Sequence, residues 1–118
     1  MIPSLLLVGL LFGQATAMPA RAQAAAADLL ESSKLGDLAR ARELLAKGAA
    51  VDAADRRGLT PLMWASAGGH TELVRQLLDS GASVSRRAAD GTTALMLAAG
   101  NGFTEIARAL IQIGRAHV

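Results

Sequence analysis

The sequence contains no cysteine and no tyrosine, and aromatic side chains make up 3% of its 118 residues. Without cysteine the chain has no disulfide scaffold, no thiolate metal site and no cysteine nucleophile. Charged residues are also few, at 19%, and the formal net charge is +2 at pH 7. A charge balance this close to neutral gives no reason to expect binding to nucleic acid or to anionic lipid.

Small apolar residues are abundant instead. The chain has 26 alanines and 12 glycines, is 52% hydrophobic, and has a mean hydropathy of +0.33. These values exclude a disordered, highly charged polypeptide. Because small side chains bury little area each, the composition favours a fold in which short elements pack closely and regularly.

The first 24 residues differ from the rest. An uncharged apolar run over residues 5–12 precedes A-x-A patterns at residues 15–17, 20–22 and 22–24. These features are typical of a secretory signal peptide, although no lysine or arginine precedes the run. The run is too short to span a bilayer stably, which takes roughly 20 apolar residues. We therefore predict a cleaved leader at 1–24 and a periplasmic or secreted domain at 25–118, without a stable membrane span.

Two alternatives stay open for the leader. Residues 1–24 are either a buried helix of a cytoplasmic protein or an uncleaved leader that anchors the protein in a membrane. The richness in alanine and arginine, without lysine-rich tracts, favours a bacterial source.

A period of 33 residues organises the remainder of the chain. The segment 55–65 recurs as 88–98, and a weaker copy of the same pattern precedes residue 55. The sequence therefore predicts three units, at about 25–54, 55–87 and 88–118. The register also holds at the pairs Gly69/Gly102, Thr71/Thr104, Glu72/Glu105, Arg75/Arg108, Leu77/Leu110 and Gly81/Gly114.

The middle unit shows how each unit is expected to fold. Thr60 can cap a helix that begins at Pro61, where the missing N–H costs nothing. Gly68–Gly69 ends this helix, and a second one is expected from about 71 to 80, with Gly81 as its left-handed closing residue. Residues 82–92 are expected to form a turn or hairpin loop. Helices this short cannot cover their own apolar faces, so the units must stack.

The middle unit resembles the ankyrin repeat, whose pattern is close to D-x-x-G-x-T-P-L-H-x-A-A-x-x-G-H-x-E-x-V-x-x-L-L-x-x-G-A-x-V-N. The third unit also matches well, and the first keeps mainly its second half, as an amino-terminal cap does. The resemblance implies an all-α solenoid of about three stacked helix-turn-helix repeats with short hairpin loops. It also implies a module that binds another protein through a concave surface. The pattern's TPLH histidine is replaced by Met63 and Met96.

No residue pattern indicates catalysis, a metal site or a cofactor site. The sequence lacks a nucleophile elbow and metal-ligand spacings, and its glycines stand at repeated turns instead of in a phosphate loop. We interpret His70 as hydrogen-bonded to backbone at the turn between two helices. The expectation is a protein that is not an enzyme and needs no cofactor.

Carried over position by position, the resemblance implies a binding surface at the hairpin tips and along the first helices. Two arginine pairs there are expected to hold an acidic partner segment, and an apolar residue at an exposed loop position adds contact. The alternative is that these tips are merely solvated. The expected binding residues are Arg56, Arg57, Leu59, Arg86, Arg87, Asp90, Thr92 and Asn101.

The last helix carries more apolar residues than one stripe needs. We expect an exposed apolar patch made of Ile106, Leu110 and Ile113, through which the chain docks on a partner or on a second copy. The alternatives are that the chain is truncated relative to a longer array, or that this is simply a somewhat apolar last helix of a monomer. Two further functions therefore stay open. The protein is an inhibitor or immunity-type partner of an exported enzyme, or it is a structural piece of a larger assembly.

Overall fold

The computed structural model describes residues 20–116, so most of the predicted leader, and His117, lie outside the described residues. Helices and the loops that join them make up the described part of the chain, which contains no strand. Its helices are α2 (Ala20–Leu35), α3 (Leu38–Ala46), α4 (Pro61–Gly68), α5 (Thr71–Asp79), α6 (Ala94–Gly100) and α7 (Thr104–Ala116).

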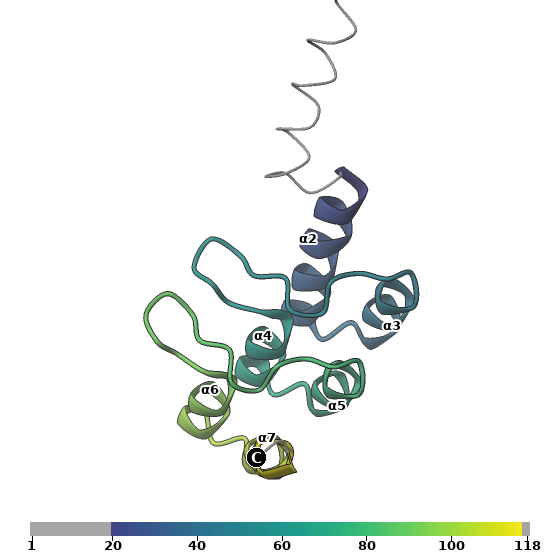
Figure 1. Ribbon diagram of the computed structural model, residues 1–118. Coiled ribbons are helices and arrows are strands. Elements are labelled where there is room, and N and C mark those ends of the chain that lie inside the picture. Colours follow the sequence, from purple (N-terminus) through teal and green to yellow (C-terminus); the bar gives the residue numbers. More distant parts are fainter. Residues whose placement is uncertain (1–19, 117–118) are drawn as a thin grey trace, which may run out of the picture.

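The helices form three antiparallel pairs that stack in two layers (Figure 1). One layer contains α2, α4 and α6, and the other contains α3, α5 and α7; neighbours within each layer are in contact. Long loops at 47–60 and 80–93 leave the second layer and project past the first layer on one side. The predicted all-α ankyrin-type solenoid is thereby confirmed.

The helix ends follow the predicted local signals. The Thr60 hydroxyl accepts a hydrogen bond from the Met63 N–H at 3.3 Å, and Thr93 does the same for Met96 at 3.2 Å. Each bond satisfies one backbone donor that the first helical turn leaves free. Gly69 closes α4 with a φ of 74°, a left-handed conformation that glycine adopts without strain.

The first repeat is the one that departs from the pattern. Its first helix, α2, has 16 residues, whereas α4 has eight and α6 has seven. This helix begins at Ala20, so it includes residues 20–24, which the sequence assigned to the end of the leader. None of the helices described by the structure is both long and apolar enough to cross a membrane.

The core lies between the two layers and runs along the stack. Helix α4 is buried on nearly all sides because it is packed against α2, α5 and α6. Helix α5 buries one stripe instead and turns Glu72 and Arg75 to solvent, where they form an ion pair at 3.4 Å. Most of the core side chains are small or medium aliphatic groups, as the composition predicted.

Candidate functional site

The two long loops end in tips of the same geometry. The Asp55 N–H donates to the Leu59 carbonyl oxygen at 3.0 Å, and Ala88, one period later, donates to Thr92 at 2.8 Å. Gly58 stands between the first pair with a φ of 80°, a conformation that side chains with a Cβ rarely adopt. Because the same hydrogen bond closes both loops, equivalent residues stand at the two tips.

The tips are also joined to one another. The Ala89 N–H donates to the Arg57 carbonyl oxygen at 2.9 Å, across the two loops. A Cβ on Gly58 would lie 2.9 Å from the Ala89 nitrogen, so only glycine permits this approach. The neighbouring loops thus share a main-chain link, although both units lack the TPLH histidine of the family pattern.

Asp52, in the first of the two loops, forms a second link between them. Its carboxylate accepts from the Ser83 N–H at 3.0 Å, and its carbonyl oxygen accepts from the Arg86 guanidinium at 3.4 Å. These bonds and the bond from Ala89 to Arg57 therefore tie the same two loops together at two places.

Trp64 is half-buried beside the loop of its own repeat. Its indole N–H donates to the Asp55 carboxylate at 3.0 Å. The Lys34 ammonium of the first repeat lies 4.7 Å from the centre of the indole ring, within the range of a cation–π contact. Trp64 therefore lies at the edge of the core, packed against its buried residues.

The Asp55 carboxylate is held in its charged form. Partial burial by itself would raise the pKa of Asp55, but hydrogen bonds from the Leu59 N–H, the Trp64 indole and the Arg57 N–H outweigh it. The pKa of Asp55 consequently lies below its ordinary value, because these donors favour the ionised form.

Asp90 plays a similar part in the next loop. Hydrogen bonds from the Thr92 hydroxyl and the Thr92 N–H, the latter at 3.0 Å, lower the pKa of the Asp90 carboxyl. The predicted binding residues Asp90 and Thr92 therefore lie together, but they are bonded to each other and shape the loop.

The arginines of the two loops contrast with the carboxylates. Arg56, Arg57 and Arg87 are exposed, and within the described residues none of them has a carboxylate oxygen within 4.0 Å. Arg86, also exposed, has the single backbone contact to Asp52. The structure therefore brings the four loop arginines, Arg56, Arg57, Arg86 and Arg87, to one side of the stack with most of their donors free.

A hollow of about 220 Å³ lies between the second and third repeats on this side. We call it the inner hollow; it is lined by Arg57, Leu59, Met63, Trp64, Ala67, Asp90, Thr92 and Leu97. A second hollow of about 270 Å³ adjoins it and shares Arg57, Leu59 and Asp90. Sequence reasoning missed the inner hollow. Trp64 and Leu97 occupy equivalent positions in neighbouring repeats, and this equivalence could have indicated that both line one hollow.

Leu59 corrects one sequence-based expectation. We expected an exposed apolar contact at the loop tip, but Leu59 is only 8% exposed and belongs to the core. It lies at a loop position in sequence, yet it belongs to the same core cluster as Ala88 of the following loop. Leu59 therefore forms part of the buried lining of the inner hollow.

Asn101 is a second predicted contact that has an internal role. Its side-chain amide donates to the carbonyl oxygens of Ala67 at 3.3 Å and Leu97 at 3.0 Å. The bond to Ala67 joins the end of α6 to the preceding repeat, and the bond to Leu97 lies within the third repeat. His70 is bonded to backbone, as predicted: its Nε2 lies 3.2 Å from the Lys34 carbonyl oxygen, an acceptor in the first repeat.

The expected apolar end patch is wrong in two of its three residues. Ile106 and Leu110 are buried in the core, and Ile113 is half-buried. Ile106, Leu110 and Ile113 follow i, i+4, i+7 spacing, which is the stripe that faces the preceding repeat. The large apolar side chains exposed at this end are Met96 and Ile111.

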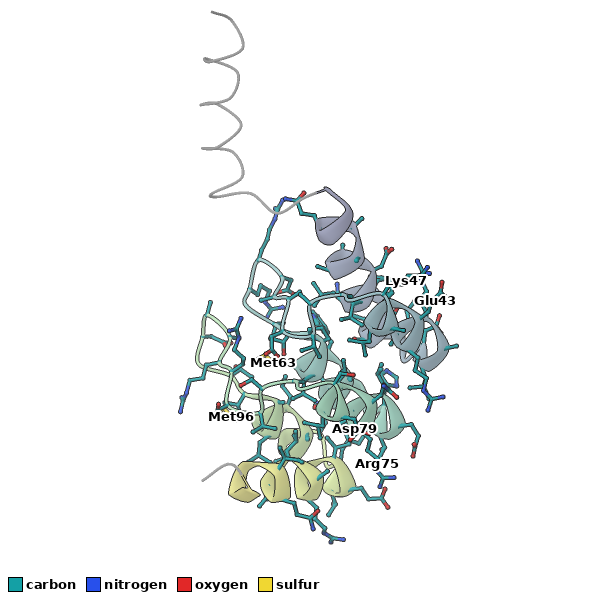
Figure 2. All side chains as sticks on the ribbon, turned by 45° about the vertical axis from the view of Figure 1, so that its right-hand side comes forward. Glu43, Lys47, Met63, Arg75, Asp79 and Met96 are labelled. Atoms are coloured by element: carbon teal, nitrogen blue, oxygen red, sulfur yellow. The ribbon has the colours of Figure 1, made fainter. Side chains whose placement is uncertain are left out.

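Met96 shows why this end differs from the interior of the stack. It is 54% exposed, whereas Met63, its equivalent one repeat earlier, is 1% exposed. Figure 2 shows the two methionines on α4 and α6, on the same side of the stack. The third repeat covers Met63, and no described repeat covers Met96.

The site offers binding chemistry. Among the described residues, no group of three or more histidine, aspartate or glutamate side chains is placed to hold a metal ion. His70 contacts main chain, and the carboxylates of Asp55 and Asp90 accept hydrogen bonds from their own loops. What faces solvent on this side is a set of guanidinium groups beside an apolar hollow.

Comparison with known proteins agrees with this architecture. A family model described as ankyrin repeats, in three copies, matches residues 29–118. No curated protein is similar enough to the chain to count as a match. Ankyrin repeats generally mediate interactions between proteins and are typically non-catalytic. With the matched span, the stacked helix pairs and the linked loops in agreement, the chain belongs to the ankyrin repeat family.

Proposed function

We propose that this chain is a non-catalytic module that binds a partner protein on the side of its projecting loops, in the periplasm or outside the cell. Family membership supports the protein partner, and the apolar run at 5–12 with the A-x-A patterns supports export. The loop arginines supply the contacts to an acidic region of the partner.

One observation carries this proposal: the free guanidinium groups stand on loops that are already fixed. The bond from Ala89 to Arg57 and the bonds of Asp55 hold the main chain before any partner arrives. A partner therefore meets an ordered surface, and little conformational entropy is lost on binding. Guanidinium groups without a carboxylate of their own keep their capacity for bidentate contacts.

The test is affinity capture from the envelope fraction of the source cells. The full chain is compared with a variant in which all four loop arginines are changed to glutamine. A control variant carries Arg75→Gln and Arg108→Gln, on helices of the other layer. A partner held by the wild type and the control but lost by the loop variant is expected. A partner that the loop variant retains at full yield contradicts the proposal.

Export is tested by the amino terminus of the protein purified from cells. We expect it after one of the A-x-A patterns within residues 15–24, in protein from the periplasm or the medium. Recovery from the cytosol with Met1 intact would rule export out.

A second candidate function is self-association through the end of the third repeat. The contrast between Met63 and Met96 favours it, because the position that a neighbour covers in the second repeat is open in the third. Light scattering of the full chain and of a Met96→Glu variant tests it. A dimer that becomes a monomer in the variant supports this function, and a wild-type monomer at high concentration excludes it.

A further inference from the structure

The inner hollow combines an apolar wall with a charged rim. Met63 and Leu59 form its buried part, and Trp64, Ala67 and Leu97 are half-buried around them. Arg57 and Asp90 are exposed on its rim. Apolar lining with a few polar groups is the general character of a ligand site in proteins.

The volume of the inner hollow limits the size of the ligand group that it can accommodate. At about 220 Å³ the inner hollow is smaller than the roughly 300–1,000 Å³ of pockets that enclose a drug-sized ligand. An apolar cavity of about 150 Å³ accommodates benzene. The inner hollow therefore has room for one apolar side chain and leaves the rest of a ligand outside.

The rim favours a negative group beside that side chain. The Asp90 carboxylate accepts hydrogen bonds from the hydroxyl and N–H of Thr92, and Asp55 accepts from Trp64 and its own loop. The Arg57 guanidinium has no carboxylate within 4.0 Å in the described part of the chain. Arg57 also borders the adjoining hollow, where Arg56 is a further cation. The rim therefore has more free donors than free acceptors.

We infer that the inner hollow takes one apolar side chain of a partner segment, and that a carboxylate on the next residue of that segment pairs with Arg57. This inference rests on the proposed protein-binding function and names the partner's chemistry: a peptide segment with an apolar residue beside an acidic one. Asp55 and Lys34 hold the Trp64 indole in place, so a ligand of the inner hollow does not have to order this side chain when it binds.

The chain supplies its own reporter for the test. Trp64 is its single tryptophan, so its fluorescence reports on the inner hollow alone. The probes are the blocked tetrapeptides acetyl-Gly-Leu-Glu-Gly-amide, the same peptide with Ala in place of Leu, and the same peptide with Gln in place of Glu. The full chain is titrated with each, and sodium hexanoate serves as a free carboxylate with an apolar tail.

The wild type is expected to bind the Leu-Glu peptide saturably at millimolar concentrations, and the Ala peptide should give no saturable change. Replacing Glu by Gln should weaken binding by about fivefold, the upper range for an exposed ion pair. Arg57→Gln should abolish the preference for Glu, whereas Arg108→Gln should preserve it. Ala67→Leu fills the inner hollow and should weaken binding of the Leu-Glu and Leu-Gln peptides, while circular dichroism confirms that the variant folds.

Equal binding of the Leu and Ala peptides, no saturable response at all, or an Ala67→Leu variant that binds normally would overturn the inference. Hexanoate binding as tight as that of the peptide would assign the inner hollow to small carboxylic acids and overturn it as well. The outcomes are separable from those of envelope capture. Loss of peptide binding with capture intact removes this inference alone, and failed capture with peptide binding intact removes the proposed function.

Discussion

His70 and Asn101 donate hydrogen bonds to equivalent carbonyl oxygens, one repeat apart. His70 Nε2 contacts Lys34, and the Asn101 amide contacts Ala67, which stands 33 positions after Lys34. The third repeat has Phe103 where the second has His70, and a phenyl ring has no donor. Asn101, two residues earlier in the chain, supplies the donor instead.

The ring at this position has a second role that both repeats keep. The His70 imidazole lies against Gly36, where a Cβ would be 2.4 Å from Nδ1. Phe103 lies against Gly69 in the same way, at 2.7 Å from a Cβ. The ring thus fills the space over the preceding turn, and the hydrogen bond to the preceding repeat is made by whichever side chain can reach it.

This relationship predicts a compensating pair of substitutions. His70→Phe keeps the ring but removes the donor to Lys34, and should lower the free energy of unfolding by about 1 kcal/mol. Gly68→Asn alone should also destabilise, because a Cβ there would lie 2.5 Å from the imidazole. Together the two changes reproduce Asn101 and Phe103 of the third repeat. Urea denaturation of all four proteins should therefore give a double variant more stable than the sum of the single losses.

Gly100→Ala is the control, since it adds a Cβ to the glycine that precedes Asn101, at the position that Ala67 occupies in the second repeat. A Cβ on Gly100 meets nothing within 4 Å. Strict additivity of His70→Phe and Gly68→Asn would contradict the shared role of His70 and Asn101.

Ser66 predicts a stabilising change. Its hydroxyl is fully buried in α4 and, in the described structure, has no hydrogen-bond partner. Ser33, one period earlier and equally buried, donates to the Leu29 carbonyl oxygen at 2.7 Å. An unpaired buried hydroxyl costs roughly 1–3 kcal/mol, so Ser66→Ala should raise the free energy of unfolding by about 1 kcal/mol. Ser33→Ala should lower it, and equal effects of the two changes would be evidence against an unpaired Ser66.

The two methionines predict a large difference between equivalent positions. Met63→Ala removes a buried side chain and should cost about 2–5 kcal/mol. Met96→Ala, at an exposed position, should change stability by no more than about 0.5 kcal/mol. Chemical denaturation at matched protein concentration measures both. A large loss for Met96→Ala would mean that this methionine is covered in solution, as self-association requires.

The sequence predicted the features that depend on local chemistry. Thr60 and Thr93 cap their helices because a hydroxyl directly before a helix meets the free N–H groups of its first turn. The period of 33 predicted the stacking, since equivalent residues must make equivalent contacts. The caps, the repeat number and the surface position of the loop arginines could therefore be predicted without a structure.

Features that depend on a neighbouring repeat could not be predicted in this way. Leu59 stands at a loop tip in sequence, but it is buried in a core cluster that includes Ala88 of the next loop. Ile106 and Leu110 are surplus apolar residues when the last helix is considered alone, although their equivalents Leu73 and Leu77 are buried in the second repeat. Comparison of burial along the period, instead of counts within one helix, identifies such residues correctly.

Asp55 predicts how the stability of the loops changes with pH. Hydrogen bonds from Leu59, Trp64 and Arg57 hold its pKa below the ordinary value despite partial burial. A carboxyl whose pKa is lowered by folding stabilises the protein above its unfolded pKa, about 3.9, and loses that contribution as the pH falls through its folded pKa. Asp55→Asn should therefore destabilise the chain clearly at pH 7 and much less in strong acid, where the protonated wild-type carboxyl resembles the amide.

The measurement is the free energy of unfolding from urea titrations at several pH values between neutral and strongly acidic. Asp79→Asn, at an exposed position at the end of α5, serves as the control for loss of a negative charge as such. Tryptophan fluorescence adds a local readout, because the indole N–H of Trp64 bonds the same carboxylate. If the difference between wild type and Asp55→Asn were the same at every pH, the ionised carboxylate would not be the acceptor that stabilises this loop. Convergence of the two proteins in acid, with divergence at neutral pH, is the expected result.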